Sequence, residues 1–369
     1  MTNHSPFPII SVEGNAHERG CQYGSQAKTL VEESLSVYRR KFECFSNRDW
    51  DECLREGEKF IPFIEEYDPE IMEEIAGIAE GSGRTIEEIV TLNARSELVG
   101  AQRWIAQIAK VKGLEGCTTL AATSEATLSK HMFMAQNWDY WLSTQKLNVI
   151  LKIKQKGKPN IVQVAEAGIV AKVGFNSAGI GLCANGSHSD KWGIGVPFQV
   201  ILRGILNARS MADAILAILR AKRASSCFYL IGRDGEAIDI EAAPNEYNYI
   251  FPDNGTIAHS NHFLIANPNI KDFLPSSSGS TLFRQYRMKK LLNKKCGDIT
   301  IDTIKEIQRD HFDKPHSICA HVDKQLAQEH QAQTNFSLIM DLNNKTLHIA
   351  LGPPCENEYT TLDFADFLR

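Results

Sequence analysis

The chain has 369 residues, 43% of them hydrophobic and 8% aromatic, and a formal net charge of -5. This length and composition allow a sizeable buried core, arranged as one large domain or two ordinary ones. A negative net charge without a dense Lys/Arg run excludes a field that would attract nucleic acid or an anionic membrane.

The first third of the sequence predicts helices. Apolar residues recur at helical spacing in four segments, and residues typical of helix starts and helix ends lie at the segment boundaries. Asp68 followed by Pro69 is typical of a helix start, Gly81-Ser82-Gly83 of a helix end, and Thr85 with Glu88 of a capping box. The predicted helices are Glu18 to Phe45, Trp50 to Glu66, Pro69 to Glu80 and Thr85 to Val99.

From Cys117 the pattern changes to period two and short apolar runs, which indicate strands. Two helices interrupt the strands near the middle, and two more precede a final hairpin that turns at Asn343-Asn344. The predicted strands are Cys117 to Thr123, His131 to Trp138, Asn148 to Lys154, Asn160 to Glu166, Ile169 to Asn176, Cys227 to Ile231, Ala237 to Ala242, Tyr247 to Phe251, Phe336 to Asp341 and Thr346 to Leu351. The predicted helices are Phe198 to Asn207, Met211 to Lys222, Thr281 to Asn293 and Asp302 to Asp310.

Most connections between strands are short enough for hairpins, so we expect antiparallel sheets. Strands in two groups with helices outside them favour an α+β fold of four layers, αββα, over a doubly wound sheet. The glycines between 174 and 186 form neither a dinucleotide nor a phosphate-binding motif, and we expect no cofactor.

Nine cysteines stand at positions 21, 44, 53, 117, 183, 227, 296, 319 and 355, with no CxxC among them. This spacing supports neither a disulfide framework nor a structural zinc site, so we expect no metal. Most of them are typical of small buried hydrophobes in a reducing compartment. No segment is apolar for long enough to cross a bilayer, and Met1 to Ile10 lacks the pattern of a signal peptide. We therefore expect a cytoplasmic protein with neither a nucleic-acid nor a membrane partner.

The dipeptide Gly116-Cys117 lies where the helical segment gives way to strands. If this bond is cut, Cys117 gains a free amine beside its thiol, and one residue then carries a nucleophile and its general base. Glycine permits the tight turn that brings the thiol to the Gly116 carbonyl. The α-amine has a pKa of roughly 7.7 to 8, close to cellular pH. The alternative is that Cys117 is a small buried hydrophobe.

Three motifs together resemble a known family: Gly116-Cys117-Thr118-Thr119, Gln136-Asn137-Trp138-Asp139 and Ser260-Asn261-His262-Phe263. They are similar to those of the acyl-coenzyme A:6-aminopenicillanic acid acyltransferase family, also called isopenicillin N acyltransferase-like. Its members are N-terminal-nucleophile hydrolases of peptidase family C45. The resemblance implies an αββα fold, self-cleavage before the cysteine, and acyl transfer or hydrolysis at amide bonds. Residues 1-116 would become a helical small subunit and 117-369 the catalytic large subunit, together one integrated domain.

The resemblance also implies residue roles. Cys117 would be the nucleophile in both reactions, and Asp139 would orient the new amine, with a cap at a strand end as the alternative. Asn261 would help to hold the oxyanion, because a neutral amide donates without titrating, and a turn asparagine is its alternative. Ser225, Ser226 and His262 are candidate supporting residues; which of the two serines lies near the nucleophile stays open.

Other histidines invite a different chemistry. His259 and His262 flank Asn261, but they have no companion carboxylate or thiolate motif for zinc. Cys319 and His321 stand two apart and could meet on one face of a strand, although nothing nearby in sequence orients the base. For this segment we expect a structural or pocket-lining role.

One departure concerns the substrate. The resemblance places an arginine just before the penultimate strand in the penicillin-pathway members, whereas residues from Gln325 through Asn344 include no Lys or Arg. A β-lactam nucleus as acyl acceptor is therefore unsupported. With a small N-acyl amide or acyl-thioester as substrate, we expect hydrolysis of the N-acyl amide to dominate and acyl transfer from acyl-thioesters to be a slower side reaction. Two alternatives are a choloylglycine-type amide hydrolase, against which the long 1-116 segment argues, and a non-catalytic binding protein on the same scaffold.

Overall fold

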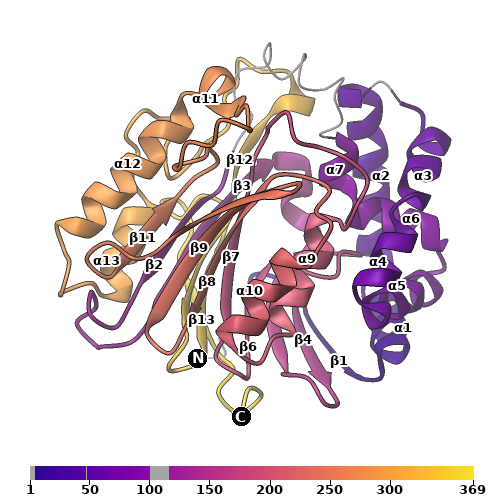
Figure 1. Ribbon diagram of the computed structural model, residues 1–369, viewed down its shortest axis with the longest axis horizontal. Coiled ribbons are helices and arrows are strands. Elements are labelled where there is room, and N and C mark those ends of the chain that lie inside the picture. Colours follow the sequence, from indigo (N-terminus) through magenta and orange to yellow (C-terminus); the bar gives the residue numbers. More distant parts are fainter. Residues whose placement is uncertain (1–4, 47, 100–115) are drawn as a thin grey trace.

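The computed structural model describes residues 5–46, 48–99 and 116–369. Within these residues two β-sheets face each other, and helices cover the outer side of each sheet (Figure 1). The first sheet contains, in spatial order, β1 (Ile9–Gly14), β4 (Asn148–Gln155), β5 (Ile161–Glu166), β6 (Val173–Asn176), β7 (Gly181–Gly186), β8 (Cys227–Arg233), β9 (Glu236–Ala243) and β10 (Glu246–Ile250). The second contains β11 (Thr256–His259), β2 (Thr118–Ala122), β3 (Phe133–Trp141), β12 (Ala332–Asp341), β13 (Thr346–Leu351) and β14 (Thr360–Asp363).

The helices form two outer layers. Those on the first sheet are α1 (Ala16–Gln26), α2 (Lys28–Ser46), α3 (Trp50–Glu58), α4 (Ile61–Tyr67), α5 (Pro69–Ser82), α6 (Ile86–Asn93), α7 (Arg95–Val99), α9 (Phe198–Leu206) and α10 (Met211–Leu219). On the other side lie α12 (Ser280–Asn293) and α13 (Ile301–Gln308), with the short α11 (Leu274–Ser277) before them. Two 3-10 helices, Leu142–Leu147 and Gln328–His330, complete the secondary structure of the described residues.

Three apolar clusters hold these layers together. Tyr38, Phe42 and Ile205 belong to the cluster between the first helix layer and the first sheet. Side chains from both sheets, such as Trp138 on β3, fill the space between the sheets. Met288 belongs to the third cluster, beneath α12 and α13. Burial of apolar area is the main stabilising contribution in such a layered domain, so each sheet is stabilised from both faces.

The predicted αββα fold is confirmed, with some corrections. The prediction of two purely antiparallel sheets is wrong at one pair, because β1 runs parallel to β4. The strands β1, β7, β11 and β14 were not predicted. The predicted helix from Glu18 to Phe45 breaks at Ala27, and that from Trp50 to Glu66 breaks at Lys59-Phe60. The segment before residue 100 is therefore not purely helical, since it contributes the edge strand β1 to the first sheet.

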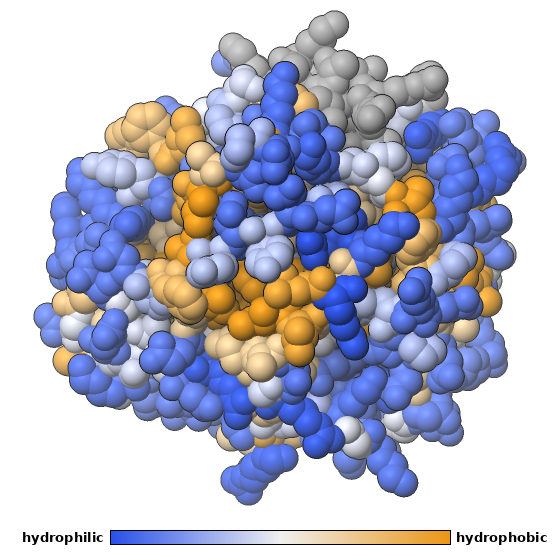
Figure 2. All heavy atoms as spheres, viewed as in Figure 1, coloured by the Kyte–Doolittle hydropathy of each residue, from blue (hydrophilic) through white to orange (hydrophobic). Residues whose placement is uncertain are grey.

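The surface is mostly hydrophilic on the face shown in Figure 2, with an apolar area near its middle. Over the parts of the chain that the structure describes, the helices lack the combination of length and apolar character that a bilayer crossing requires.

Candidate active site

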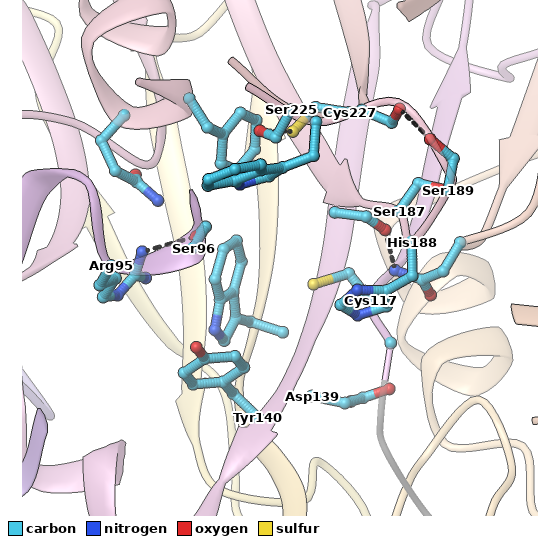
Figure 3. Close-up of a pocket in the computed structure, with 18 of the residues that line it drawn as sticks. Arg95, Ser96, Cys117, Asp139, Tyr140, Ser187, His188, Ser189, Ser225 and Cys227 are labelled. Carbon is cyan, nitrogen blue, oxygen red and sulfur yellow. Dashed lines mark hydrogen bonds between the residues drawn. The ribbon is translucent and has the colours of Figure 1, made fainter. Parts of the chain in front are cut away.

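Cys117 lies immediately before β2, at the inner side of the second sheet. Its side chain belongs to the apolar cluster between the sheets, and the residue is 5% exposed. Two buried side chains hold its backbone carbonyl: Nδ2 of Asn185 donates to it at 3.0 Å, and Nη1 of Arg284 donates to it at 2.9 Å. The nucleophile candidate is therefore fixed at its backbone, while its sulfur points into a cavity (Figure 3).

Asn261 lies two residues after β11, with its side chain against Gly116. Its Oδ1 accepts a hydrogen bond from Nη2 of Arg284 at 3.1 Å, and its Nδ2 donates to the Gly186 carbonyl at 2.9 Å. A Cβ atom on residue 116 would stand 1.7 Å from Oδ1 of Asn261, so the close approach requires glycine there. Arg284 sets the orientation of the amide, because a guanidinium donates to the oxygen and not to the nitrogen.

Asp139 lies near the end of β3, also beside Gly116 and Cys117. Burial raises the pKa of its carboxyl group to about 7, although the Arg284 charge and a hydrogen bond from Thr334 lower it. The Thr334 hydroxyl donates to Oδ1 at 2.6 Å. The other oxygen, Oδ2, is buried and has no hydrogen-bond partner among the described residues. A buried oxygen without a hydrogen bond lowers the stability of the folded state unless a hydrogen-bond donor binds to it.

The Cys117 thiol is not activated in the uncut chain. Burial raises its pKa to about 12, and the nearby Asp139 charge adds to this effect. Hydrogen bonds from Gln136 and from the Asp139 backbone act in the opposite direction, as does the charge of Lys172. The thiol is therefore protonated near neutral pH, and its reaction requires a base close by.

The alternation of β3 explains the motif Gln136-Asn137-Trp138-Asp139. The side chain of Gln136 reaches across to the first sheet, where Nε2 donates to the Ala184 carbonyl at 2.7 Å. Asn137 points the other way and donates to the carbonyls of Gln308 and Ile318. Trp138 again packs between the sheets. The motif thus ties the strand to both neighbouring layers and places Asp139 at its end.

A cavity of ≈ 120 Å³ opens beside the Cys117 sulfur. Figure 3 shows Cys117 and Asp139 on one side of it and Ser225 and Cys227 on another. Its aromatic wall consists of Trp138, Tyr140, Trp141, Trp192 and Phe198. Among the described lining residues, Arg95 pairs with Glu166 at 3.3 Å and Lys191 with Asp190 at 3.4 Å.

The structure brings together Gly116, Cys117, Asp139, Asn261, Ser225 and Ser226, all of which line this cavity. The Ser225 hydroxyl donates to buried Glu97 at 2.8 Å, while the Ser226 hydroxyl lies 2.7 Å from that of Ser189. His262 is not part of the lining. Its Nδ1 contacts the hydroxyls of Ser260 and Thr281, and burial lowers its pKa to about 4. His262 is thus a neutral neighbour of the Asn261 turn.

Two residues of the site were missed from the sequence. Arg284 stands in a predicted helix whose charged residues are typical of a solvated face, yet it is 5% exposed and holds both Cys117 and Asn261. Asn185 stands on β7, a strand that the glycines around it concealed. Its Oδ1 accepts from the Thr119 hydroxyl at 2.8 Å, which fixes the amide nitrogen toward Cys117.

Cys117 thus leads into an interior strand of an αββα sandwich and lines a cavity between the two sheets. Over residues 127–356 the sequence matches the family described as acyl-coenzyme A:6-aminopenicillanic acid acyl-transferase. This match covers more than half of the chain, and the chain belongs to that family. It is thus a member of a family of acyl-transferring enzymes.

Individual relatives were also found. The chain is 29% identical over 355 residues to the 40 kDa form of the acyl-coenzyme A:6-aminopenicillanic-acid-acyltransferase of Emericella nidulans, covering 94% of this chain and 92% of that protein. Among solved structures, a variant of conjugated bile acid hydrolase from Clostridium perfringens matches with a TM-score of 0.47 at 14% identity, over 68% of this chain and 93% of that one. Penicillin V acylase from Agrobacterium tumefaciens matches with a TM-score of 0.45 at 10% identity, over 64% and 83%.

Proposed function

We propose that the chain cuts itself between Gly116 and Cys117 and then uses Cys117 to hydrolyse a small N-acyl amide through a thioester. Transfer of the acyl group to an amine is the slower side reaction. The observation that carries the proposal is that Gly116, Cys117, Asp139 and Asn261 meet at one cavity, with the Asn261 side chain against Gly116.

In the self-cleavage step the Cys117 sulfur attacks the Gly116 carbonyl carbon. The thiol proton passes to the peptide nitrogen, the C–N bond breaks, the nitrogen leaves as the Cys117 amine, and the Gly116 acyl group stays on sulfur as a thioester. Water then hydrolyses the thioester to a Gly116 carboxylate and a free thiol. The 1-116 chain remains bound as a partner subunit, since its strand β1 pairs with β4 and its helices pack on the first sheet.

In turnover the new amine takes the proton of the Cys117 thiol, which otherwise has a pKa of about 12. The unpartnered Oδ2 of Asp139 supplies an acceptor for that amine and orients it. The thiolate attacks the amide carbonyl of the substrate, and Asn261 donates an N–H to the oxyanion. The substrate C–N bond then breaks, the amine leaves with the proton that the Cys117 amine had taken, and water hydrolyses the acyl-Cys117 thioester to the free acid and the thiol. Its Nδ2 carries two hydrogens, and the bond to Gly186 uses one of them.

The cavity favours hydrolysis over transfer. Transfer requires a site that holds the amine against the thioester and so competes with water. A carboxylate on the acceptor would need a cation without a partner, but Arg95 and Lys191, the Arg and Lys of the lining that the structure describes, are already paired. The aromatic wall instead fits the acyl portion of the substrate.

Intact-mass analysis tests the self-cleavage. We expect two associated chains, 1-116 and 117-369, from the wild-type protein and one uncut chain from Cys117→Ala, because one sulfur serves both reactions. Cys227→Ala, which changes another buried cysteine at the same cavity, is the matched control and should be cut. A wild-type chain that stays uncut would leave the alternative of a binding protein on this scaffold.

Product analysis tests the reaction. The cut protein is given N-acyl amides and acyl-thioesters, with and without a panel of amines, and free acid is quantified against new amide. We expect acid to dominate. If more amide than acid forms at modest amine concentration, acyl transfer and not hydrolysis is the main reaction.

A further inference from the structure

Four potential metal ligands gather in the loops beside the second sheet, and one of them, His321, shares a small cavity with Gly116 and Asp139. His311 follows α13, Cys319 and His321 precede β12, and Cys355 follows β13. Their ligand atoms all lie within 4.8 Å of one another. Cys319 is buried, His321 is half-buried, and His311 and Cys355 are exposed, so an ion could reach the cluster from solvent.

Four of the six separations between the ligand atoms are close to those of a tetrahedron around one ion, and the other two are at most 4.8 Å. Zinc–sulfur bonds of roughly 2.3 Å and zinc–nitrogen bonds of roughly 2.0–2.1 Å place neighbouring tetrahedral ligands roughly 3.3–3.8 Å apart. Here Nε2 of His311 and Nε2 of His321 are 3.1 Å apart, and the two sulfurs are 3.5 Å apart. Nε2 of His321 is 3.6 Å from the Cys319 sulfur and 3.3 Å from the Cys355 sulfur.

Groups around the cluster also suit a metal. Nδ1 of His321 lies 3.3 Å from a carboxylate oxygen of Glu356, so the ring can donate there and turn Nε2 toward an ion. The Cys319 N–H donates to the Asp310 carbonyl at 3.0 Å, and the His321 N–H donates to the Pro315 carbonyl at 2.9 Å. Two of the four ligands are therefore held at their backbone before any ion binds.

We propose that His311, Cys319, His321 and Cys355 bind one zinc ion in a closed structural site. Two imidazoles and two thiolates complete a tetrahedral shell and leave no position for substrate, and the two thiolates balance the charge of the ion. Both sulfurs bind the ion as thiolates, so binding releases their protons and the zinc affinity falls as the pH is lowered.

The ion would join two loops that support the catalytic layer. One loop carries residues 310–321 and the other residues 353–358. The first is connected to the active site, because the Ala320 N–H donates to the Thr334 hydroxyl at 3.0 Å and that hydroxyl donates to Asp139. A zinc ion at this place would stabilise the strand end on which Asp139 stands, whether or not the chain cuts itself.

The site escaped the sequence analysis because its ligands show no short repeating spacing. Cys355 stands 36 residues after Cys319, and the two meet only because the β12–β13 hairpin returns the chain. The expectation of no metal rested on the missing CxxC motif, which the geometry makes unnecessary.

Metal content tests the proposal. The full chain is purified with a tag that contains no histidine, under a non-chelating reductant and with zinc supplied, and zinc is measured by mass spectrometry. We expect about one zinc per chain and, after exchange with cobalt(II), absorption bands of a tetrahedral site with thiolate ligands. Cys355→Ala and His311→Ala change exposed side chains, and each should weaken zinc binding by roughly 100-fold or more. The reason is that loss of a residue that only hydrogen-bonds to a metal ligand already weakens metal binding by roughly 10–100-fold.

Matched controls use the same residue types outside the cluster. Cys296→Ala removes another exposed cysteine, and His316→Ala removes another histidine of the same loop, and both should keep the metal. The proposal is overturned if the reduced chain binds no zinc, if both ligand variants keep it, or if peptide mapping finds Cys319 and Cys355 joined in a disulfide that prevents uptake. Zinc content is read independently of cleavage and turnover, so failure here leaves the proposed function untouched.

Discussion

Asp139→Asn in the uncut chain tests the electrostatics of the site most directly. The pKa of this carboxyl group is raised from 3.8 to about 7, mainly by burial. A raised carboxyl pKa means that the folded state binds the proton more tightly than the unfolded state, so stability falls as the pH rises from 4 to 7. At about 1.36 kcal/mol per pKa unit, ionisation of Asp139 costs the folded chain roughly 4 kcal/mol above pH 7.

Asparagine keeps the shape and can still accept from Thr334, but it carries no charge. We therefore expect Asp139→Asn to raise the free energy of unfolding by up to about 4 kcal/mol at pH 7.5 and by almost nothing near pH 4. For a chain of this length the gain corresponds to a rise of about 5 °C in Tm.

The comparison is made in a Cys117→Ala background, so that both proteins keep the bond after Gly116. Thermal and urea unfolding are followed at pH 4.5, 6 and 7.5. Asp234→Asn is the control, since that side chain is 77% exposed and should change little at any pH. A gain that is equal at all three pH values, or a loss at pH 7.5, would refute the reasoning and would mean that Asp139 already has a charged partner in the uncut chain.

Three further predictions concern Gly116, Asn261 and Arg284. In the cut protein, Asn261→Ala should lower kcat by about 10² to 10³ with little change in KM, whereas a protein that melts while its folded fraction turns over normally would make Asn261 a turn former. Gly116→Ala should slow cleavage roughly 10-fold or more, measured by intact mass over time, because overpacking against Asn261 costs about 1–3 kcal/mol. Arg284→Met should lower kcat because the Asn261 amide loses its orientation, while Arg287→Met on the same helix should not; equal rates in both variants would contradict this role.

Helix boundaries could be read from the sequence where capping residues mark them. Asp68 accepts from the Glu70 N–H at the start of α5, Gly83 ends that helix in a left-handed conformation, and Thr85 with Glu88 forms the predicted capping box. These signals are local, so one sequence suffices to find them.

Features that depend on distant contacts could not be read in this way. The strand β1 exists because it pairs with β4, about 140 positions later in the chain. The strand β7 reads GLCANG, and its glycines resemble loop residues, although β6 and β8 enclose it on both sides. Pairing of this kind is set by tertiary context, which overrides local propensity.

The same distinction applies to the site. Cys117, Asp139 and Asn261 stand in motifs, so the sequence named them as candidates, and they line one cavity. Arg284, which connects two of them, stands in no motif. Arg284 is recognisable only once α12 is packed on the second sheet, because a helix with charged residues on several sides is otherwise typical of a solvent-facing element.

The Arg284 guanidinium donates to the Cys117 carbonyl and to the Asn261 oxygen, and its charge also lowers the pKa of Asp139. A single buried cation thus fixes the positions of Cys117 and Asn261 while it keeps the Asp139 carboxyl group able to ionise near neutral pH. Burial and the Asp139 charge both raise the pKa of the Cys117 thiol, so the thiol stays protonated near neutral pH while the bond after Gly116 is intact. Release of an amine at Cys117 is the change that would give Asp139 a partner and the thiol a base at once.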